Sequence, residues 1–315
     1  MKTEELTRYA ERALKRHGFE LAVNRFPPDR CFDLVARGEG ISIVVKTAYD
    51  MLEVPRRQLD ELYAISNWAS ATPLILAERR GDEKLDSDAV YVRGGVYAIS
   101  PTALRRSLEG DPPLVEVGPA GCYVYINGEA MKEKREKLGL SVGELARLVG
   151  VSRMTIYSYE RERRRRTTPN VAYRLEYVLG IPIVIPVDPL RYRPSAERRP
   201  IPEDLMARAL GKGILGLVAR LLSRLKLAVR ALSHAPFDML VKHDGEMIKV
   251  ALNVVDKEGY DERRINSTRK FAELMGLNHL VVRTSSCKRP EDVASIGIDE
   301  LKSIRRPEEF AQLLT

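Results

Sequence analysis

The chain is expected to fold as a mixed α/β protein in which an all-helical domain lies between two repeated α/β domains. Two observations predict this arrangement. Segments near both ends resemble each other in order and spacing, and each combines amphipathic helices with apolar strands. Between them the pattern is helical throughout, with a capping residue or a glycine at the helix ends. We expect the three domains at residues 1–118, 125–190 and 200–315.

The repeat rests on short matches at a nearly constant spacing. Phe32–Val35 recurs as Phe237–Leu240, 205 residues later (237 − 32). Two weaker matches are Leu21–Val23 with Leu227–Val229 and Ala98–Ser100 with Ser303–Arg305. Each copy reads as an amphipathic helix, a strand, a turn, a buried strand, a second helix and a further strand.

Composition narrows the class of protein. The net charge is +8 with a pI of about 9.3, and the basic excess lies in the middle of the chain, which favours an anionic partner. Aromatic residues make up only 6%, which argues against a single-strand binding surface built on base stacking. Three scattered cysteines and the absence of a long apolar run predict a cytoplasmic protein without a membrane span, a cofactor or a zinc site.

Residues 129–160 predict three short helices joined by tight turns. Gly139 ends the first helix, and Ser141 with Glu144 forms a capping box for the second. Gly150 breaks the chain in the turn, and small Ala146 lets two crossing helices approach closely. The inner face of the second helix is expected to consist of Leu145, Ala146, Leu148 and Val149. A fourth helix is expected from Pro169 to Leu179, where Gly180 ends it.

This pattern resembles the Cro/repressor-type (XRE-like) helix-turn-helix (HTH) over residues 130–182. With its two flanking copies, the chain resembles a group of archaeal HTH-type transcriptional regulators. The resemblance implies a homodimer that binds double-stranded DNA sequence-specifically and has no enzymatic activity.

The resemblance also implies roles for individual residues. Arg153, Met154 and Ser158 would read base edges in the major groove. Contacts to the DNA backbone would come from Ser152, Thr155, Tyr157, Arg161, Arg163, Arg164, Arg165 and Arg166. Arg135 and Glu160 would form a structural ion pair. Val142 departs from the pattern, because the family commonly has a phosphate-contacting glutamine there.

The flanking copies resemble the PD-(D/E)xK nuclease fold, as found in archaeal junction resolvases. That chemistry needs an aspartate, followed on the next strand by an acid-x-lysine triplet that helps to hold a divalent metal. In the first copy Asp33 and Lys46 fit, but Val44 replaces the acid. In the second copy Asp238 fits, and we expect Lys249-Val250-Ala251 at the triplet.

We therefore expect neither a metal site nor catalytic residues. The alternative is a metal-dependent DNA nuclease or junction-resolvase relative guided by the helix-turn-helix, in which Glu11 or Glu20 supplies the missing carboxylate.

Overall fold

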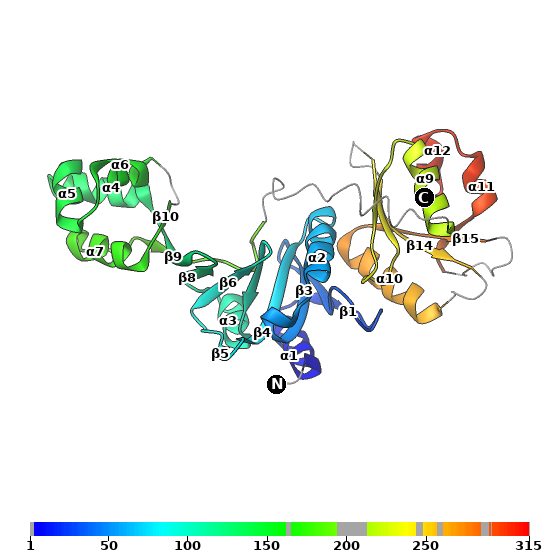
Figure 1. Cartoon of the computed structure of the whole chain (residues 1–315), viewed down its shortest axis with the longest axis horizontal. Helices are drawn as coiled ribbons and strands as arrows, with labels where there is room; N and C mark the ends of the chain where they lie inside the picture. Colours follow the sequence, from blue (N-terminus) through cyan, green and yellow to red (C-terminus); the bar gives the residue numbers. More distant parts are fainter. Residues whose placement is uncertain are drawn as a thin grey trace. The chain divides into compact units, whose positions relative to one another are not determined.

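The computed structural model describes residues 3–161, 165–193, 213–243, 248–256, 261–284, 290 and 292–314. The chain forms two compact units, of which one contains residues 48–52 and 74–192 and the other residues 2–47, 53–73 and 193–315. No helix in these described ranges has the length and apolar content needed to cross a bilayer. The architecture is mixed α/β, with a helical domain in the middle of the chain (Figure 1).

The N-terminal part of the second unit begins with an amphipathic helix that covers an antiparallel hairpin. α1 (Thr3–Arg16) buries Leu6, Ala10 and Leu14 along one face. Strands β1, β2 and β3 pair antiparallel in that order, and a turn at Glu39-Gly40, both with positive φ, joins the last two. The remaining bounds are β1 Glu20–Val23, β2 Leu34–Gly38, β3 Ile41–Asp50, the 3-10 turn η1 Met51–Glu53 and α2 Arg56–Trp68.

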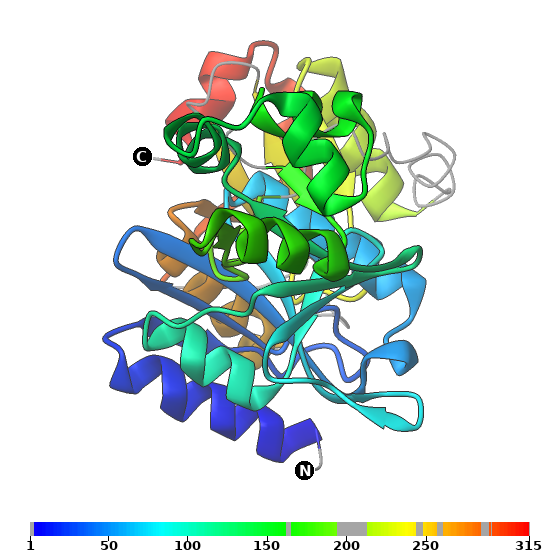
Figure 2. The same cartoon turned by 90° about the vertical axis from the view of Figure 1, so that its left-hand side faces the viewer.

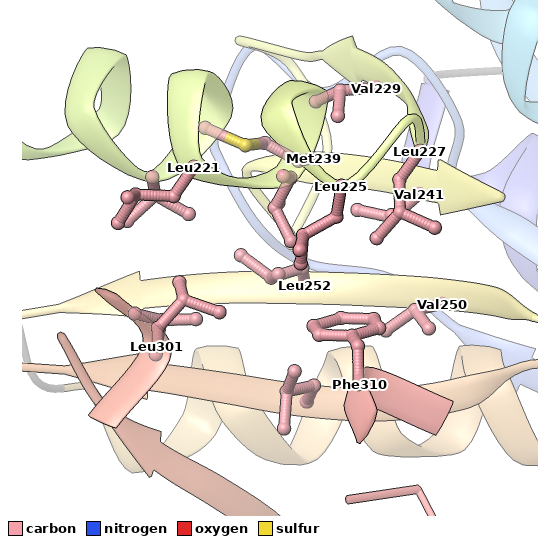
Figure 3. Close-up of a cluster of buried hydrophobic side chains, with 14 of the residues drawn as sticks. Leu221, Leu225, Leu227, Val229, Met239, Val241, Val250, Leu252, Leu301 and Phe310 are labelled. Carbon is pink, nitrogen blue, oxygen red and sulfur yellow. The ribbon is translucent and has the colours of Figure 1, made fainter. Parts of the chain in front are cut away.

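The second copy is a five-stranded sheet with the order β12-β13-β14-β15-β16. Its first strands are antiparallel, whereas β14, β15 and β16 run parallel. Side chains of α9, β13 and β14 meet over one face in an apolar core that also takes in Phe310 of α12 (Figure 3). The bounds are α9 Ile214–Arg224, β12 Ala228–Ala231, β13 Met239–Lys242, β14 Lys249–Val255, α10 Glu262–Met275, β15 Asn278–Arg283, β16 Ala294–Gly297, α11 Ile298–Ser303 and α12 Pro307–Gln312.

The two copies share their strand pattern, but the sequence matches outside Phe32–Val35 are out of structural register. Asn24 N donates to Asp33 O, and Leu232 N donates in the same way to Asp238 O. Asn24 therefore corresponds to Leu232, which moves the expected match of Leu21–Val23 with Leu227–Val229 by two residues.

The downstream match is also wrong. Ala98–Ser100 ends strand β7 (Val96–Ile99) and caps the helix that follows, whereas Ser303–Arg305 begins at the last residue of helix α11. The physical reason is that the first copy has two further strands, β5 (Glu83–Lys84) and β6 (Ala89–Arg93), between β4 (Thr72–Arg80) and β7, the strands that correspond to β15 and β16. More residues therefore separate β4 from β7 than separate β15 from β16.

The first unit contains the remaining strands of the first copy, followed by the helical domain. Its strands pair in the order β4-β7-β6-β8-β9-β10, while β5 pairs with β4 and β11 with β9. The bounds not given above are α3 Pro101–Leu108, β8 Val115–Gly118, β9 Gly121–Ile126, α4 Gly128–Lys137, α5 Val142–Val149, α6 Arg153–Glu160, β10 Arg165–Thr167, α7 Pro169–Leu179 and β11 Val184–Ile185.

Helices α4 to α7 share one small apolar core. Both cartoon views show these four helices grouped together (Figures 1 and 2). The capping box is present, because Ser141 N donates to Glu144 Oε2 over 2.8 Å and Glu144 N donates to Ser141 Oγ over 3.2 Å. Gly150 ends α5 in the left-handed region with φ of 74°. Ala146, buried at the helix crossing, accepts the backbone N–H groups of both Gly150 and Val151.

One expected core residue lies outside this core. Leu148 is 56% exposed, while Leu145, Ala146 and Val149 are buried. The inner face of α5 is narrower than predicted. Leu145, Ala146 and Val149 form it, whereas Leu148, although three residues after Leu145, lies beyond the edge of this face and is exposed to solvent.

Backbone pairing joins the helical domain to the sheet. Strand β9 pairs with β8 before the helices, and afterwards pairs with β10 and β11 as the chain returns. Beyond β11, Val187 N donates to Pro113 O, and the Tyr192 ring stacks on Tyr97 at 3.8 Å. Several paired segments, rather than a single linker, therefore hold the helical domain to the sheet of the same unit.

A buried carboxylate lies at this junction. Glu116 of β8 is 6% exposed. Its Oε2 accepts hydrogen bonds from Tyr97 Oη at 2.8 Å and Tyr125 Oη at 3.0 Å. Arg166 Nη2 lies 3.0 Å from Glu116 Oε1, and the Arg166 guanidinium covers the Tyr123 ring at 3.6 Å. Burial and the bond to Glu116 raise the pKa of Tyr97, so this hydroxyl stays protonated and donates.

We predict that Arg166→Gln lowers the free energy of unfolding by about 1–3 kcal/mol, because it leaves Glu116 buried without its cation. Thermal and urea denaturation of the full chain would measure this. The double variant Glu116→Gln/Arg166→Gln should recover part of the loss, since the buried group is then neutral. Equal stability of Arg166→Gln and the parent chain would show that the ion pair contributes nothing.

Candidate nucleic-acid interface

Helix α6, the third helix of the predicted helix-turn-helix, presents an exposed face. Ser152 caps the helix, accepting from Thr155 N at 3.0 Å, and its hydroxyl also bonds to Thr155 Oγ1 at 2.8 Å. Ile156 is fully buried and fixes the inner face. Arg153 and Met154 are exposed, with Met154 at 72%. The first turn of α6 therefore carries one exposed cationic side chain and one exposed apolar side chain.

Arg153 depends on a glycine of the preceding helix. A Cβ built on Gly143 would lie 2.8 Å from Arg153 Nε and 3.1 Å from Arg153 Cζ. The guanidinium thus rests over the first turn of α5, in space that only a glycine leaves open. Gly143 was not identified from the sequence, because its φ is ordinary and its contact is with a side chain ten residues away.

The next turn of α6 adds an aromatic and a second cation. Tyr157 is 49% exposed, and the Arg161 guanidinium lies 5.4 Å from its ring centroid. Such a stack holds the guanidinium near the end of the helix without neutralising its charge. Ser158 is half-buried, so its hydroxyl is less available than the side chains of Met154 and Tyr157.

An ion pair inside the domain orients the end of α6. Arg135 of α4 bonds to both carboxylate oxygens of Glu160, Nε to Oε1 at 2.6 Å and Nη2 to Oε2 at 3.0 Å. Arg135 Nη1 also donates to Leu140 O at 2.7 Å. The hydrogen bonds to Glu160 raise the pKa of Arg135. Both side chains are less than a tenth exposed, so the pair joins helices and leaves no charge for a ligand.

The arginine run after α6 divides into different environments. Arg161 is exposed beside the reading face. Arg163 and Arg164 lie outside the described residues. Arg165 is half-buried in strand β10, and Arg166 pairs with Glu116. Of the described members, Arg161 is therefore the best placed to reach a phosphate.

The aspartate of the first nuclease-like copy is neutralised by protein cations. Asp33 is 1% exposed, with Arg30 Nε 2.7 Å from Oδ1 and Lys46 Nζ 3.4 Å from Oδ2. Thr47 N donates to Asp33 Oδ2 at 2.7 Å. Val44, at the expected acid position, is fully buried. The Asp33 carboxylate is thus used to bind the backbone of β3 and the two cations, and does not face a metal ion.

In the second copy the triplet differs from the expected Lys249-Val250-Ala251. Asp238 N donates to Leu252 O and Val254 N donates to Asp238 Oδ2, as Asp33 does with Val45 and Thr47. Ala251 and Asn253 therefore take the positions of Val44 and Lys46. The expected triplet was two residues early because more residues separate β13 from β14 than the Glu39-Gly40 pair that separates β2 from β3.

The surroundings of Asp238 are also cationic. Arg264 Nη2 of α10 lies 2.7 Å from Asp238 Oδ1. Asn253 Oδ1 lies 2.9 Å from His279 Nε2, and burial lowers the pKa of His279 to about 4, with a further contribution from Arg269. His279 is therefore neutral near pH 7.

These residues do not fit a divalent metal. Both copies lack an acid at the second strand position, where Val44 and Ala251 lie, and each remaining aspartate has a guanidinium nitrogen at 2.7 Å. Among the described residues, no group of three histidine, cysteine, aspartate or glutamate side chains could hold a metal ion. Two carboxylates are the minimum that the nuclease chemistry described above requires.

Family models match the chain in two regions. A PD-(D/E)XK superfamily domain matches residues 3–113, and a helix-turn-helix model matches residues 131–185. No solved structure is significantly similar to the chain.

Curated relatives extend the similarity over the whole chain. A Thermococcus gammatolerans protein named "Putative HTH-type transcriptional regulatory protein" is 32% identical and aligns with 100% of this chain and 96% of its own length. Proteins of the same name from Methanosphaerula palustris and Methanoregula boonei are 30% and 35% identical. They cover 94% and 73% of this chain, and 94% and 70% of their own lengths. The chain belongs to this archaeal family of HTH-type transcriptional regulatory proteins, with a PD-(D/E)XK-type domain before its helix-turn-helix.

Proposed function

We propose that the chain is a sequence-specific regulator that binds double-stranded DNA through α6 and has no nuclease activity. The observation that carries this proposal is the outward face of α6, where Arg153 and Met154 are exposed and the Arg135–Glu160 pair fixes the helix. An arginine fork suits guanine O6 and N7, and a thioether suits a thymine methyl.

The proposal separates base reading from backbone binding. Arg153 and Met154 read base edges, with Ser158 in a lesser role because it is half-buried. Arg161, held by Tyr157, binds phosphate beside the groove. Ser152 and Thr155, at the N-terminal end of α6, contact the DNA backbone beside these residues.

One such helix contacts only a few base pairs, so we propose that a homodimer places two of them on half-sites about one helical turn apart. An operator with two-fold symmetry follows from that arrangement. Arg166 is left out of the DNA contacts, because releasing it would strand Glu116.

The PD-(D/E)XK match keeps a metal-dependent nuclease as the second candidate. It requires an acid where Val44 and Ala251 lie, and a carboxylate free of the cations that hold Asp33 and Asp238. We therefore propose that the α/β copies have lost the catalytic function of the nuclease fold and serve a structural role.

We predict that Arg153→Ala and Arg161→Gln weaken DNA binding in different ways. Arg153→Ala should cost about 1–3 kcal/mol on the preferred duplex and little on random duplex. Arg161→Gln should weaken both duplexes alike and reduce the slope of log affinity against log salt by about one unit. Fluorescence anisotropy across a salt series measures both quantities.

The matched control is Arg105→Gln, which removes an exposed arginine of α3 that pairs only with Glu109 among its described contacts. It should leave both affinities unchanged. Equal losses on both duplexes for Arg153→Ala would contradict the assignment of base reading to this residue.

We also predict no cleavage of duplex, flap or four-way-junction DNA by the full chain with magnesium or manganese. The variant Asp33→Asn serves as the control, because it keeps the shape of the side chain and removes the charge. Gel analysis of end-labelled substrates should give identical patterns for both proteins. Cleavage by the parent chain that disappears in Asp33→Asn would instead establish the nuclease.

A further inference from the structure

One part of the first copy, residues 2–47 and 53–73, contacts the second copy within one compact unit. Helix α10 of the second copy packs on β1 and β2 of the first (Figure 1). At the centre, the Phe271 ring lies 5.4 Å from Phe32 and 4.9 Å from Phe237, and all three rings are buried. Phe32 and Phe237 are the matching residues of the repeat, so Phe271 contacts equivalent positions of both copies.

The ends of α2 and α10 establish which of their residues correspond. After α2, Ala71 N donates to Ser66 O, and after α10, Leu277 N donates to Ala272 O. Ser70 and Gly276, with φ of 53° and 67°, occupy the same place in these two turns. Trp68 therefore corresponds to Leu274, and Glu61 to Ser267.

One pair of contacts is reciprocal between the two copies, at the C-terminal ends of α2 and α10. Lys242 Nζ, at the end of β13, lies 5.2 Å from the Trp68 ring. Arg37, the residue of β2 that matches Lys242, donates through Nη1 to Leu274 O at 3.4 Å. Each helix thus meets the cationic strand residue of the other copy at the same position.

A second pair of contacts is repeated at the ends of the first strands. Ser267 Oγ donates to Asn24 Oδ1 at 3.0 Å. In the matching position, Glu61 accepts from Ser233 N at 2.9 Å and from His234 N at 2.8 Å. Leu232 is the residue that corresponds to Asn24, and Ser233 follows it directly. The two helices therefore contact equivalent ends of the first strands.

We infer that the two copies form an internal pseudo-dimer, related by an approximate two-fold axis through the Phe32–Phe271–Phe237 cluster. Reciprocal contact, in which one copy's helix meets the other's strand and the reverse, defines a two-fold interface. The face by which one copy would bind an identical copy is therefore covered by its partner in the same chain.

This pairing restricts how whole chains associate. A homodimer of the regulator does not use the α2/α10 face of the α/β copies, because both halves of that face are already occupied. It carries one helix-turn-helix for every pair of α/β copies. The alternative is exchange, in which the same face is completed by the second copy of another chain.

Cysteine cross-linking separates these arrangements. In full-length protein with Cys122→Ser and Cys287→Ser, one variant carries Arg37→Cys with Leu274→Cys, and the other carries Trp68→Cys with Lys242→Cys. Each is treated with a short bismaleimide over a dilution series and analysed by denaturing gel and intact mass. The four variants that carry only one of the introduced cysteines are the controls. Cys31, which is buried, is retained in every variant. Circular dichroism confirms folding.

The internal pseudo-dimer predicts that both pairs link within one chain, in a fraction that does not change on dilution. Links between chains that increase with concentration would overturn it, as would closure of only one pair or of neither. Hydrogen exchange on the unmodified chain provides a second test. The amides of Cys31, Ser233 and His234, which donate across this face, should be protected equally at all concentrations. Rapid exchange at these three amides would also overturn the inference.

Discussion

The requirement that a buried carboxylate find a partner determines much of this structure. Withdrawing a charge from water costs several kcal/mol unless opposite charge or hydrogen bonds replace the solvent. Glu160 meets this requirement through Arg135 and thereby fixes the end of the reading helix. Glu116 meets it through Arg166 and two tyrosines, and so ties the helical domain to β8. Glu61 meets it through backbone amides of the other α/β copy, which helps to close the pair.

The same requirement explains the state of the nuclease-like copies. A catalytic pair of acids repels itself until a metal binds, whereas a single aspartate can be compensated by one guanidinium. Asp33 and Asp238 have such partners, Arg30 from the preceding loop and Arg264 from α10. Each aspartate also accepts the backbone N–H of the next strand, from Thr47 and from Val254. Both aspartates therefore stabilise the fold, although the second acid position of each copy holds an apolar residue, Val44 or Ala251.

Local features of the helix-turn-helix were predictable from the sequence, whereas long-range ones were not. Ser141, Glu144 and Gly150 act on backbone within four residues, so their identity determines the caps. The partner of Arg166 lies on β8, fifty residues earlier, and no spacing rule relates Glu116 to it. The predicted alignment of the second copy with the first was wrong for a similar reason. Only strand pairing shows that Asn253, and not Ala251, corresponds to Lys46.

The most direct measurement of the central claim is selection of DNA by the full chain from a pool of random duplexes, followed by sequencing. The account predicts enrichment of one motif of two inverted half-sites about one helical turn apart, with the enriched positions lost when Met154 and Arg153 are both replaced by alanine. Recovery of DNA without enrichment of any sequence over the input pool would contradict it, because α6 would then bind only the backbone or no DNA at all.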